Sequence, residues 1–348
     1  MIKRIFQGVG LLVVLALVVM VVSIVRFDKT MEELAPKYAA APSQFIELPD
    51  GAKAHVRDQG KKDGPVLVLV HGSNASLHTW EPWVAILGAK YRVVTLDMPG
   101  HGLTGGVPND DYSRDGMVKF THEVAEKLGL TSYAIGGNSM GGGVAAAYTQ
   151  EYPKEVTALI LVDAGGLPRV ANPNEKVPLG FRMARWPVIN KVLKYLAPRN
   201  IYAEGVRKVF VDQSKVTEEM IDRYYDMNLY QGNRRATGMR FAMEYDTKVA
   251  DRLGEIRVPT LIMWGDKDGL IPVASAYEFQ KRIEGAKVVV YPDVGHIPME
   301  EVPEKSAADV DAFLAEALTA GAVGGAHEGE TLPVEHEGEV KPMAVSPE

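Results

Sequence analysis

Short apolar runs rich in β-branched residues alternate with longer helical patterns through most of this 348-residue chain. Because the middle runs are apolar without interruption, we expect strands buried on both faces, as in a parallel sheet covered by helices. Runs at 43–48 and 52–60, joined through Pro49-Asp50-Gly51, predict an opening antiparallel pair. The pattern therefore predicts an α/β fold whose sheet is mostly parallel and has about eight strands. The other strands are expected at 66–71, 91–97, 132–138, 156–163, 259–266 and 286–293, and helices at 113–128, 141–152, 273–284 and 303–318.

One long segment interrupts this alternation. Residues 165–253 carry helix-like patterns rich in Arg, Tyr and Met, without a run typical of a parallel strand. A structureless loop of that length is uncommon inside a compact domain. We therefore expect an inserted helical lid between two parts of one core, at 43–164 and 254–319. Such a lid would cover the carboxyl edge of the sheet, where open α/β sheets bind ligands.

The amino-terminal segment differs from the rest of the chain. An apolar run extends from Ile5 to Val25, about the length that a helix needs to cross a bilayer core. Residues 1–30 are thus predicted to be a single-pass transmembrane anchor, and 31–42 a linker. A cleaved signal peptide is the alternative, with the small residues at 38–43 as a late cleavage site. The short amino-terminal flank favours an extracytoplasmic, or periplasmic, catalytic domain.

Composition and charge also limit the partners. Residues 320–348 are rich in Glu, Gly and Pro and predict a disordered acidic tail, in which the spacing of His327 and His336 matches no common metal site. A formal net charge of −7 argues against nucleic-acid binding. The absence of cysteine excludes disulfides and a thiol nucleophile. We therefore expect a small or neutral ligand; the sequence does not indicate an oligomeric state.

The stretch Gly137-Asn138-Ser139-Met140-Gly141 follows a predicted strand and precedes a predicted helix. It fits G-x-S-x-G, in which a serine occupies a strained strand-to-helix turn and small neighbours let strand and helix pass closely. No Lys-Ser or Lys-Thr pair follows the glycines and G-x-G-x-x-G is absent, so a phosphate loop and a dinucleotide site are disfavoured. Ser139 is therefore the candidate nucleophile.

A serine nucleophile needs a base and an acid that orients the base. His296 directly follows the last predicted strand, on the same sheet edge as Ser139, whereas the other histidines lie in the hairpin, a helix, earlier turns or the tail. Asp268, in a loop after the preceding strand, is the preferred acid. Asp266 is expected to form the turn, Asp163 and Asp293 are fallback acids, and Asp97 is expected to be structural.

The oxyanion that forms during acyl transfer also needs hydrogen-bond donors. The amide of Met140, directly after Ser139 at a helix start, is expected to supply one. The turn after the strand at 66–71 is expected to supply the second, from Ser73 as first choice or Asn74 as second. Gly72 would let that backbone approach the substrate.

These motifs resemble those of serine hydrolases in the α/β-hydrolase superfamily, over about 45–318. The matching segments are HGSNASLHTW, LDMPGHG, GGNSMGGG, VPTLIMWGDKDGLIP and VGHIPMEEVPE, in family order, and Ser, Asp and His follow in the order of that family. The chain is also similar to membrane-anchored monoacylglycerol lipases. The resemblance implies two-step acyl transfer through Ser139, His296 and Asp268, with no metal or organic cofactor.

The resemblance implies a hydrophobic ester as substrate, with monoacylglycerol-like lipids favoured by the predicted anchor. Residues predicted to bind the substrate are Asn74, Trp80, Met183, Trp186 and Ile297. The lid segment 181–198 mixes basic and apolar residues, so it either lies on a lipid surface or simply caps the core.

Three alternatives stay open at this point. Carbon-carbon bond hydrolases share NSMGG but generally carry tryptophan after the catalytic histidine, where Ile297 stands here. A cofactor-free perhydrolase activity is compatible with the same residues. A membrane-anchored, non-catalytic binding protein is the alternative from another class, because fold does not imply function.

Overall fold

The computed structural model describes residues 25–168, 198–243 and 246–327, together with four separate positions near the amino terminus. Within those residues, no helix is both long and apolar enough to cross a membrane. The predicted anchor falls almost entirely outside the described residues, as do Met183, Trp186 and the end of the predicted tail.

The predicted sheet is confirmed. Its eight strands lie in the order β1-β2-β4-β3-β5-β6-β7-β8. The β1–β2 and β2–β4 pairs are antiparallel, and the remaining pairs are parallel. The strands are β1 (Ser43–Glu47), β2 (Lys53–Gly60), β3 (Val66–Val70), β4 (Arg92–Leu96), β5 (Tyr133–Asn138), β6 (Val156–Val162), β7 (Thr260–Gly265) and β8 (Lys287–Tyr291).

Helices cover both faces of this sheet, because successive strand residues point to opposite sides and most of them are apolar. In β3, for example, Val68 and Val70 face one hydrophobic cluster, while Leu67 and Leu69 face the other. The first cluster is closed by α4 (Arg114–Lys127), α5 (Met140–Glu151) and α12 (Ala274–Arg282), and the second by α3 (Glu81–Leu87) and α14 (Pro303–His327).

The predicted linker contains a helix, α2 (Met31–Tyr38). Thr30 and Glu33 form a capping box at its start, a local signal that sequence reasoning missed. Leu34 and Tyr38 are buried in a small cluster with Met227. The helix therefore packs the segment 31–38, within the predicted linker 31–42, against the inserted helices.

At the other end, α14 continues to His327, into the segment that was predicted to be a disordered tail from residue 320. Helix propagation is cooperative, and no proline interrupts the chain between the packed part of α14 and His327. The rest of that tail lies outside the described residues.

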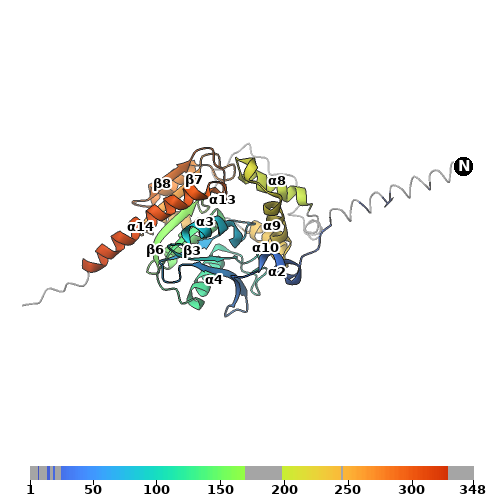
Figure 1. Cartoon of the computed structure of the whole chain (residues 1–348), viewed down its shortest axis with the longest axis horizontal. Helices are drawn as coiled ribbons and strands as arrows, with labels where there is room; N and C mark the ends of the chain where they lie inside the picture. The colour runs from blue at the N-terminus through green and yellow to red at the C-terminus, as the bar shows by residue number, and fades with distance from the viewer. Residues whose placement is uncertain are drawn as a thin grey trace, which may run out of the picture.

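The described part of the segment between β6 and β7 is helical. In Figure 1 its larger helices lie together on the right, with α2 below them. Asn228 and Thr237 from these helices donate hydrogen bonds to Asn74, in the loop that follows β3. The inserted helices are α8 (Arg199–Val209), α9 (Glu218–Leu229), α10 (Asn233–Ala242) and α11 (Lys248–Asp251), with short 3-10 turns at Gln213–Lys215 and Leu253–Glu255. They thus reach the carboxyl edge of the sheet.

Candidate active site

Ser139 occupies a strained turn between β5 and α5. Its φ of 53° and ψ of −119° lie where L-residues are rarely found. The turn is possible because its flanking glycines lack side chains: a Cβ on Gly137 would lie 2.1 Å from the Gly141 oxygen, and one on Gly141 would lie 2.2 Å from the Val70 oxygen. Ser139 is only partly buried, so its hydroxyl is held at the surface of the sheet edge.

Gly142, which follows Gly141 in α5, has a packing role. A Cβ on Gly142 would lie 2.4 Å from the Cβ of Ala164, which follows β6. Close packing of α5 against the next strand therefore accounts for a glycine that the turn itself does not require.

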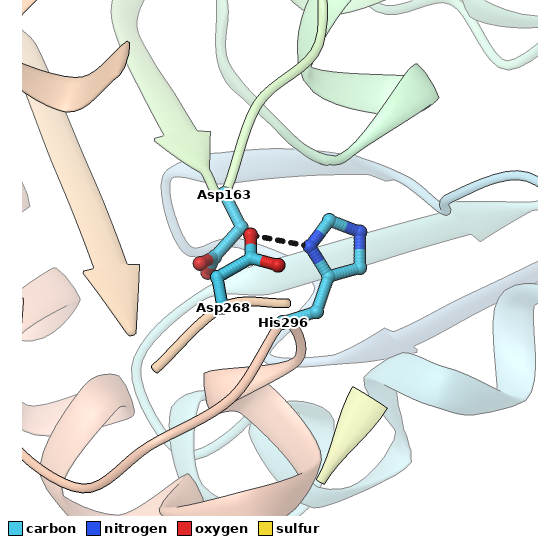
Figure 2. Close-up of side chains that lie close together, drawn as sticks. All are labelled: Asp163, Asp268 and His296. Atoms are coloured by element: carbon cyan, nitrogen blue, oxygen red, sulfur yellow. Dashed lines mark hydrogen bonds and ion pairs between the residues drawn. The ribbon is translucent and has the colours of Figure 1, made fainter. Parts of the chain in front are cut away.

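His296 and Asp268 meet at the same edge, from the loops after β8 and β7. His296 Nδ1 lies 2.7 Å from Asp268 Oδ2, and the two side chains are 5% and 0% exposed. Asp268 Oδ1 accepts hydrogen bonds from the amides of Leu270 and Ile271, so the carboxylate is fixed in place. Figure 2 shows His296 with its other ring nitrogen directed away from Asp268. That nitrogen is available as a base.

The nucleophile turn and the histidine loop are tied together by Asn138. Its side-chain amide donates to the carbonyls of His296, at 3.0 Å, and Val162, at 3.2 Å. Among the described residues, Ser139 makes no side-chain hydrogen bond to His296. Catalytic hydrogen bonds are often long in an unliganded enzyme and shorten when substrate binds.

Asp163, a fallback acid, lies beside this pair at the end of β6 (Figure 2). Its Oδ1 accepts from the Gly265 amide, while its buried Oδ2 has no hydrogen-bond partner among the described residues. Burial, followed by the negative charge of Asp268, raises the pKa of Asp163 well above the ordinary value. Burial thus favours the protonated, neutral form of Asp163, whereas an orienting acid acts as a charged carboxylate.

This raised pKa makes a testable difference to stability. Between the ordinary value of 3.8 and its raised folded-state pKa, Asp163 keeps a proton that the unfolded chain has lost. The free energy of unfolding should therefore fall with rising pH in that window, by up to about 1.4 kcal/mol per pH unit. Asp163→Asn removes this dependence. Chemical unfolding of both proteins from pH 4 to 9 should show the variant gaining stability relative to wild type as pH rises.

A matched control for that experiment is Asp266→Asn. Lys267 holds the pKa of the half-buried Asp266 below its ordinary value, so this substitution should leave the stability in the neutral and alkaline range unchanged. Parallel stability curves for wild type and Asp163→Asn would show that Asp163 is ionised in the folded protein.

The predicted oxyanion donors lie next to Ser139. Met140 is the first residue of α5, where backbone amides have no acceptor within the helix. A Cβ on Gly72 would lie 3.2 Å from the Ser139 Cβ, so the loop that carries Ser73 approaches the nucleophile closely. Asn74 has a φ of 59° and its side chain accepts from Thr237. Both predicted donors, and their alternative, are thus at the same edge of the sheet.

Two predicted substrate-binding residues, Trp80 and Ile297, are buried in the core. Trp80 is fully buried and packs 5.1 Å from the ring of Trp83. Ile297 is 4% exposed and belongs to the same hydrophobic cluster. Their apolar character reflects packing in the described structure. Met183 and Trp186 lie outside the described residues, so only Asn74 of this predicted set is on the loop facing the inserted helices.

Asp97 is structural, as its position suggested. It accepts hydrogen bonds from the amides of Leu77 and Leu103 and from His55 Nδ1. Although burial opposes ionisation, His55 and the other nearby histidines lower the pKa of Asp97. The His71 ring is also hydrogen-bonded, because its Nε2 accepts a hydrogen bond from the Met98 amide. These groups order the loops beneath Ser73 and are not free to act as the base.

Sequence reasoning missed two buried glutamates just after His296. Glu301 accepts from the amides of Gly295 and Val211 and so fixes the histidine loop to the chain after α8. Glu300 accepts from Arg223 at 2.6 Å and Tyr224 at 2.8 Å, and also from Thr79. Two adjacent acids near a helix start look like ordinary surface charges in the sequence. Only their distant partners show that they position the site.

Asp163, Asp268 and His296 also form the one group of possible metal ligands found among the described residues, with ligand atoms within 4.8 Å of one another. A separation of 2.7 Å between His296 Nδ1 and Asp268 Oδ2 is that of a hydrogen bond between a histidine and the carboxylate that orients it. We therefore interpret this group as acid-base machinery.

Two other concavities lie at the opposite edge of the sheet. A cavity of about 160 Å³ is lined by residues at the amino ends of β3, β5 and β6 and by α14. A second is lined by β7, β8, α12 and α14. Ser139 and His296 follow the carboxyl ends of their strands, so neither concavity belongs to the candidate active site.

Comparison with known proteins agrees with this arrangement. A family model of the alpha/beta hydrolase fold matches residues 65–303. The chain therefore belongs to the α/β-hydrolase family and is a hydrolase of that superfamily. A structure described as a membrane phospholipase A, a novel bacterial virulence factor, is 25% identical, with a TM-score of 0.63, and the match covers 90% of this chain and 99% of that chain.

Lipases and hydrolases of oxo-dienoic acids are both found among the relatives of this chain. Human monoacylglycerol lipase ABHD6 is 29% identical over 255 residues, 72% of this chain and 75% of that protein. Lipase 3 of Moraxella sp. is 26% identical over 298 residues, covering 83% and 88%. A 2-hydroxy-6-oxononadienedioate/2-hydroxy-6-oxononatrienedioate hydrolase of Klebsiella pneumoniae is 28% identical over 277 residues, covering 75% and 91%.

Proposed function

We propose that this protein hydrolyses carboxylic esters with Ser139 as nucleophile, His296 as base and Asp268 as orienting acid. The observation that carries the proposal is the buried 2.7 Å contact between His296 Nδ1 and Asp268, at the edge where Ser139 occupies its strained turn. Such a contact fixes the histidine tautomer and stabilises the imidazolium that forms during reaction.

In the proposed reaction, the Ser139 hydroxyl attacks the ester carbonyl and His296 Nε2 takes its proton. The amides of Met140 and Ser73 bind the oxyanion. The intermediate collapses with loss of the alcohol, which receives the proton from His296. Water then attacks the acyl-enzyme with His296 again as base, and the acid leaves as Ser139 regains its proton. No metal or organic cofactor takes part in this scheme.

The substrate proposed is a hydrophobic ester, such as a monoacylglycerol. The lipases among the relatives support a lipid ester as the substrate of this chain, although their names describe only those proteins. The apolar run from Ile5 to Val25 supports a membrane-anchored, extracytoplasmic enzyme, with the inserted helices as a lid over the site. Anchoring would keep the active site close to a lipid surface.

A second candidate is hydrolysis of a carbon-carbon bond, the activity suggested by the name of the Klebsiella relative. Ile297 after the base, in place of the tryptophan that the resemblance leads one to expect, weighs against it. The two candidates share Ser139 and His296 but differ in the bond that is broken.

An ester panel tests the proposal. Full-length protein in detergent should hydrolyse 4-nitrophenyl esters with kcat/KM rising with acyl length, by up to roughly fourfold for each methylene buried. It should also cleave a long-chain monoacylglycerol. A preference for acetyl over long acyl esters would contradict the lipid substrate. Hydrolysis of a 2-hydroxy-6-oxodienoate can be monitored by the loss of its absorbance. If this compound is hydrolysed faster than every ester, the second candidate is favoured.

A further inference from the structure

Arg240 differs from the other arginines of the inserted helices. Within the described part of the chain, its hydrogen-bond partners are all neutral, and no carboxylate lies within ion-pair distance of it. The other arginines between 198 and 243 each contact an acid. These pairs are Arg199 with Glu218 and Asp222, Arg207 with Glu218, Arg223 with Glu300, Arg234 with Asp28, and Arg235 with Asp110.

The partners of Arg240 fix its guanidinium without neutralising it. Arg240 Nη1 lies 2.9 Å from His101 Nε2, and Nη2 donates to Ser73 Oγ at 2.8 Å and to Asn74 Oδ1 at 3.4 Å. The other ring nitrogen of His101 lies 2.9 Å from the Pro99 carbonyl, to which it donates, so Nε2 is an acceptor. Burial, followed by the charge of Arg240, lowers the pKa of His101 well below its ordinary value, which keeps the ring neutral.

The positive charge itself persists. Burial lowers the pKa of Arg240 to about 10, so the guanidinium is still protonated at neutral pH. A guanidinium has five N–H donors, and the three contacts with neutral groups leave others unused. Arg240 is only partly buried, so part of the residue remains accessible.

This charge also contacts the loop that approaches the nucleophile. Ser73, which Arg240 contacts, follows Gly72, and a Cβ on Gly72 would lie 3.2 Å from the Ser139 Cβ. A charged group that is partly desolvated without a counter-ion is costly, and a carboxylate or phosphate is the partner that a guanidinium binds most strongly. The natural counter-ion at this position is therefore part of a molecule bound at Ser139.

We propose that Arg240 binds an anionic group of the substrate, a carboxylate or a phosphate close to the scissile ester. This inference rests on the proposed ester hydrolysis at Ser139, and it makes hydrophobic esters that carry such a group better substrates than their neutral counterparts. The anion lies either on the acyl side or on the alcohol side of the ester.

Two matched substrate pairs distinguish an anionic group on the acyl side of the ester from one on the alcohol side. On the acyl side, mono-4-nitrophenyl glutarate is compared with 4-nitrophenyl pentanoate. On the alcohol side, 1-oleoylglycerol 3-phosphate is compared with 1-oleoylglycerol. In each pair the measured quantity is kcat/KM for the anionic ester divided by that for the neutral ester. Arg240→Gln should lower this ratio roughly tenfold to hundredfold in one pair, as expected for loss of hydrogen bonds to a charged group. Arg240→Lys should restore part of it.

The control is Arg235→Gln, on the same helix, where the guanidinium is bound to Asp110 at the surface. Its selectivity ratios should equal those of wild type. If Arg240→Gln lowers kcat/KM by the same factor for both esters of each pair, Arg240 only supports the Ser73 loop and the inference is overturned. Unchanged ratios in both pairs overturn it as well.

A binding measurement separates this inference from the proposed catalysis. In full-length Ser139→Ala, calorimetric titration with mono-4-nitrophenyl glutarate and with 1-oleoylglycerol 3-phosphate should show at least roughly tenfold weaker binding of one of them when Arg240→Gln is added. Equal affinities with and without Arg240→Gln would overturn the inference. Failure of wild type to react with a fluorophosphonate at Ser139 would instead contradict the proposed function, and the titration would still decide the role of Arg240.

Discussion

Replacing Ser139 with alanine is expected to lower kcat on a 4-nitrophenyl ester by roughly four to six orders of magnitude, as loss of a serine nucleophile does in hydrolases of this type. The physical reason is that the proposed acyl-enzyme can form only on the Ser139 oxygen. The amides of Met140 and Ser73 would remain, so a small rate above that in water should persist. Steady-state kinetics together with labelling by a fluorophosphonate probe measure the effect.

Stability serves as the control for that variant. Alanine at a φ of 53° is about as strained as serine, so the free energy of unfolding should change by less than about 1 kcal/mol. Undiminished fluorophosphonate labelling of Ser139→Ala, located on another residue by peptide mapping, would show that the nucleophile is elsewhere.

Replacing Asp268 with asparagine is expected to lower kcat by roughly 10⁴-fold. The asparagine side chain would offer an amide N–H in place of one carboxylate oxygen, so the neutral histidine would turn to the wrong tautomer, with its proton on Nε2. Asp268 lies 2.7 Å from His296 Nδ1 and accepts hydrogen bonds from two backbone amides. Because its carboxylate is held in place in this way, the substitution alters the group that orients His296. Steady-state kinetics over a range of pH measure both the fall in kcat and any change in its pH dependence.

Asp163→Asn is the matched comparison, because the two acids lie side by side and only one contacts His296 by a hydrogen bond (Figure 2). Asparagine imitates a protonated aspartic acid and can still accept from the Gly265 amide. Its kcat should fall less than roughly tenfold, because the His296 contact is left intact. A variant pair with the opposite ranking, active as Asp268→Asn and inactive as Asp163→Asn, would move the orienting acid to β6.

Much of the fold follows from local sequence. The run Val66–Val70 became a central strand because Val and Leu without a polar interruption are typical of a strand covered on both faces. The turn at Ser139 follows from glycines at fixed offsets between such a strand and a helix. Parallel strands end at one edge, so Asp268 and His296 lie near that turn.

Other features depend on partners that are far away in the sequence. Trp80 was expected to contact substrate, yet it packs on Trp83 in the core, because a large apolar side chain after a strand has the same appearance in either role. Helix α2 was missed because Leu34 and Tyr38 are buried against residues that are distant in the sequence, Leu103 and Met227. Glu300 resembles a surface charge until Arg223 is placed beside it.

The sequence by itself determined the α/β class, the succession of strands along the chain and the residues available for chemistry at the carboxyl edge, because these depend on periodicity and on short motifs. Tertiary structure alone decided that Asp163 is buried with a raised pKa, that Glu300 and Glu301 hold the residues around His296 in place, and that Arg240 reaches Ser73 from α10. Burial and ion pairing are properties of groups brought together by folding, so no local pattern in the chain specifies them.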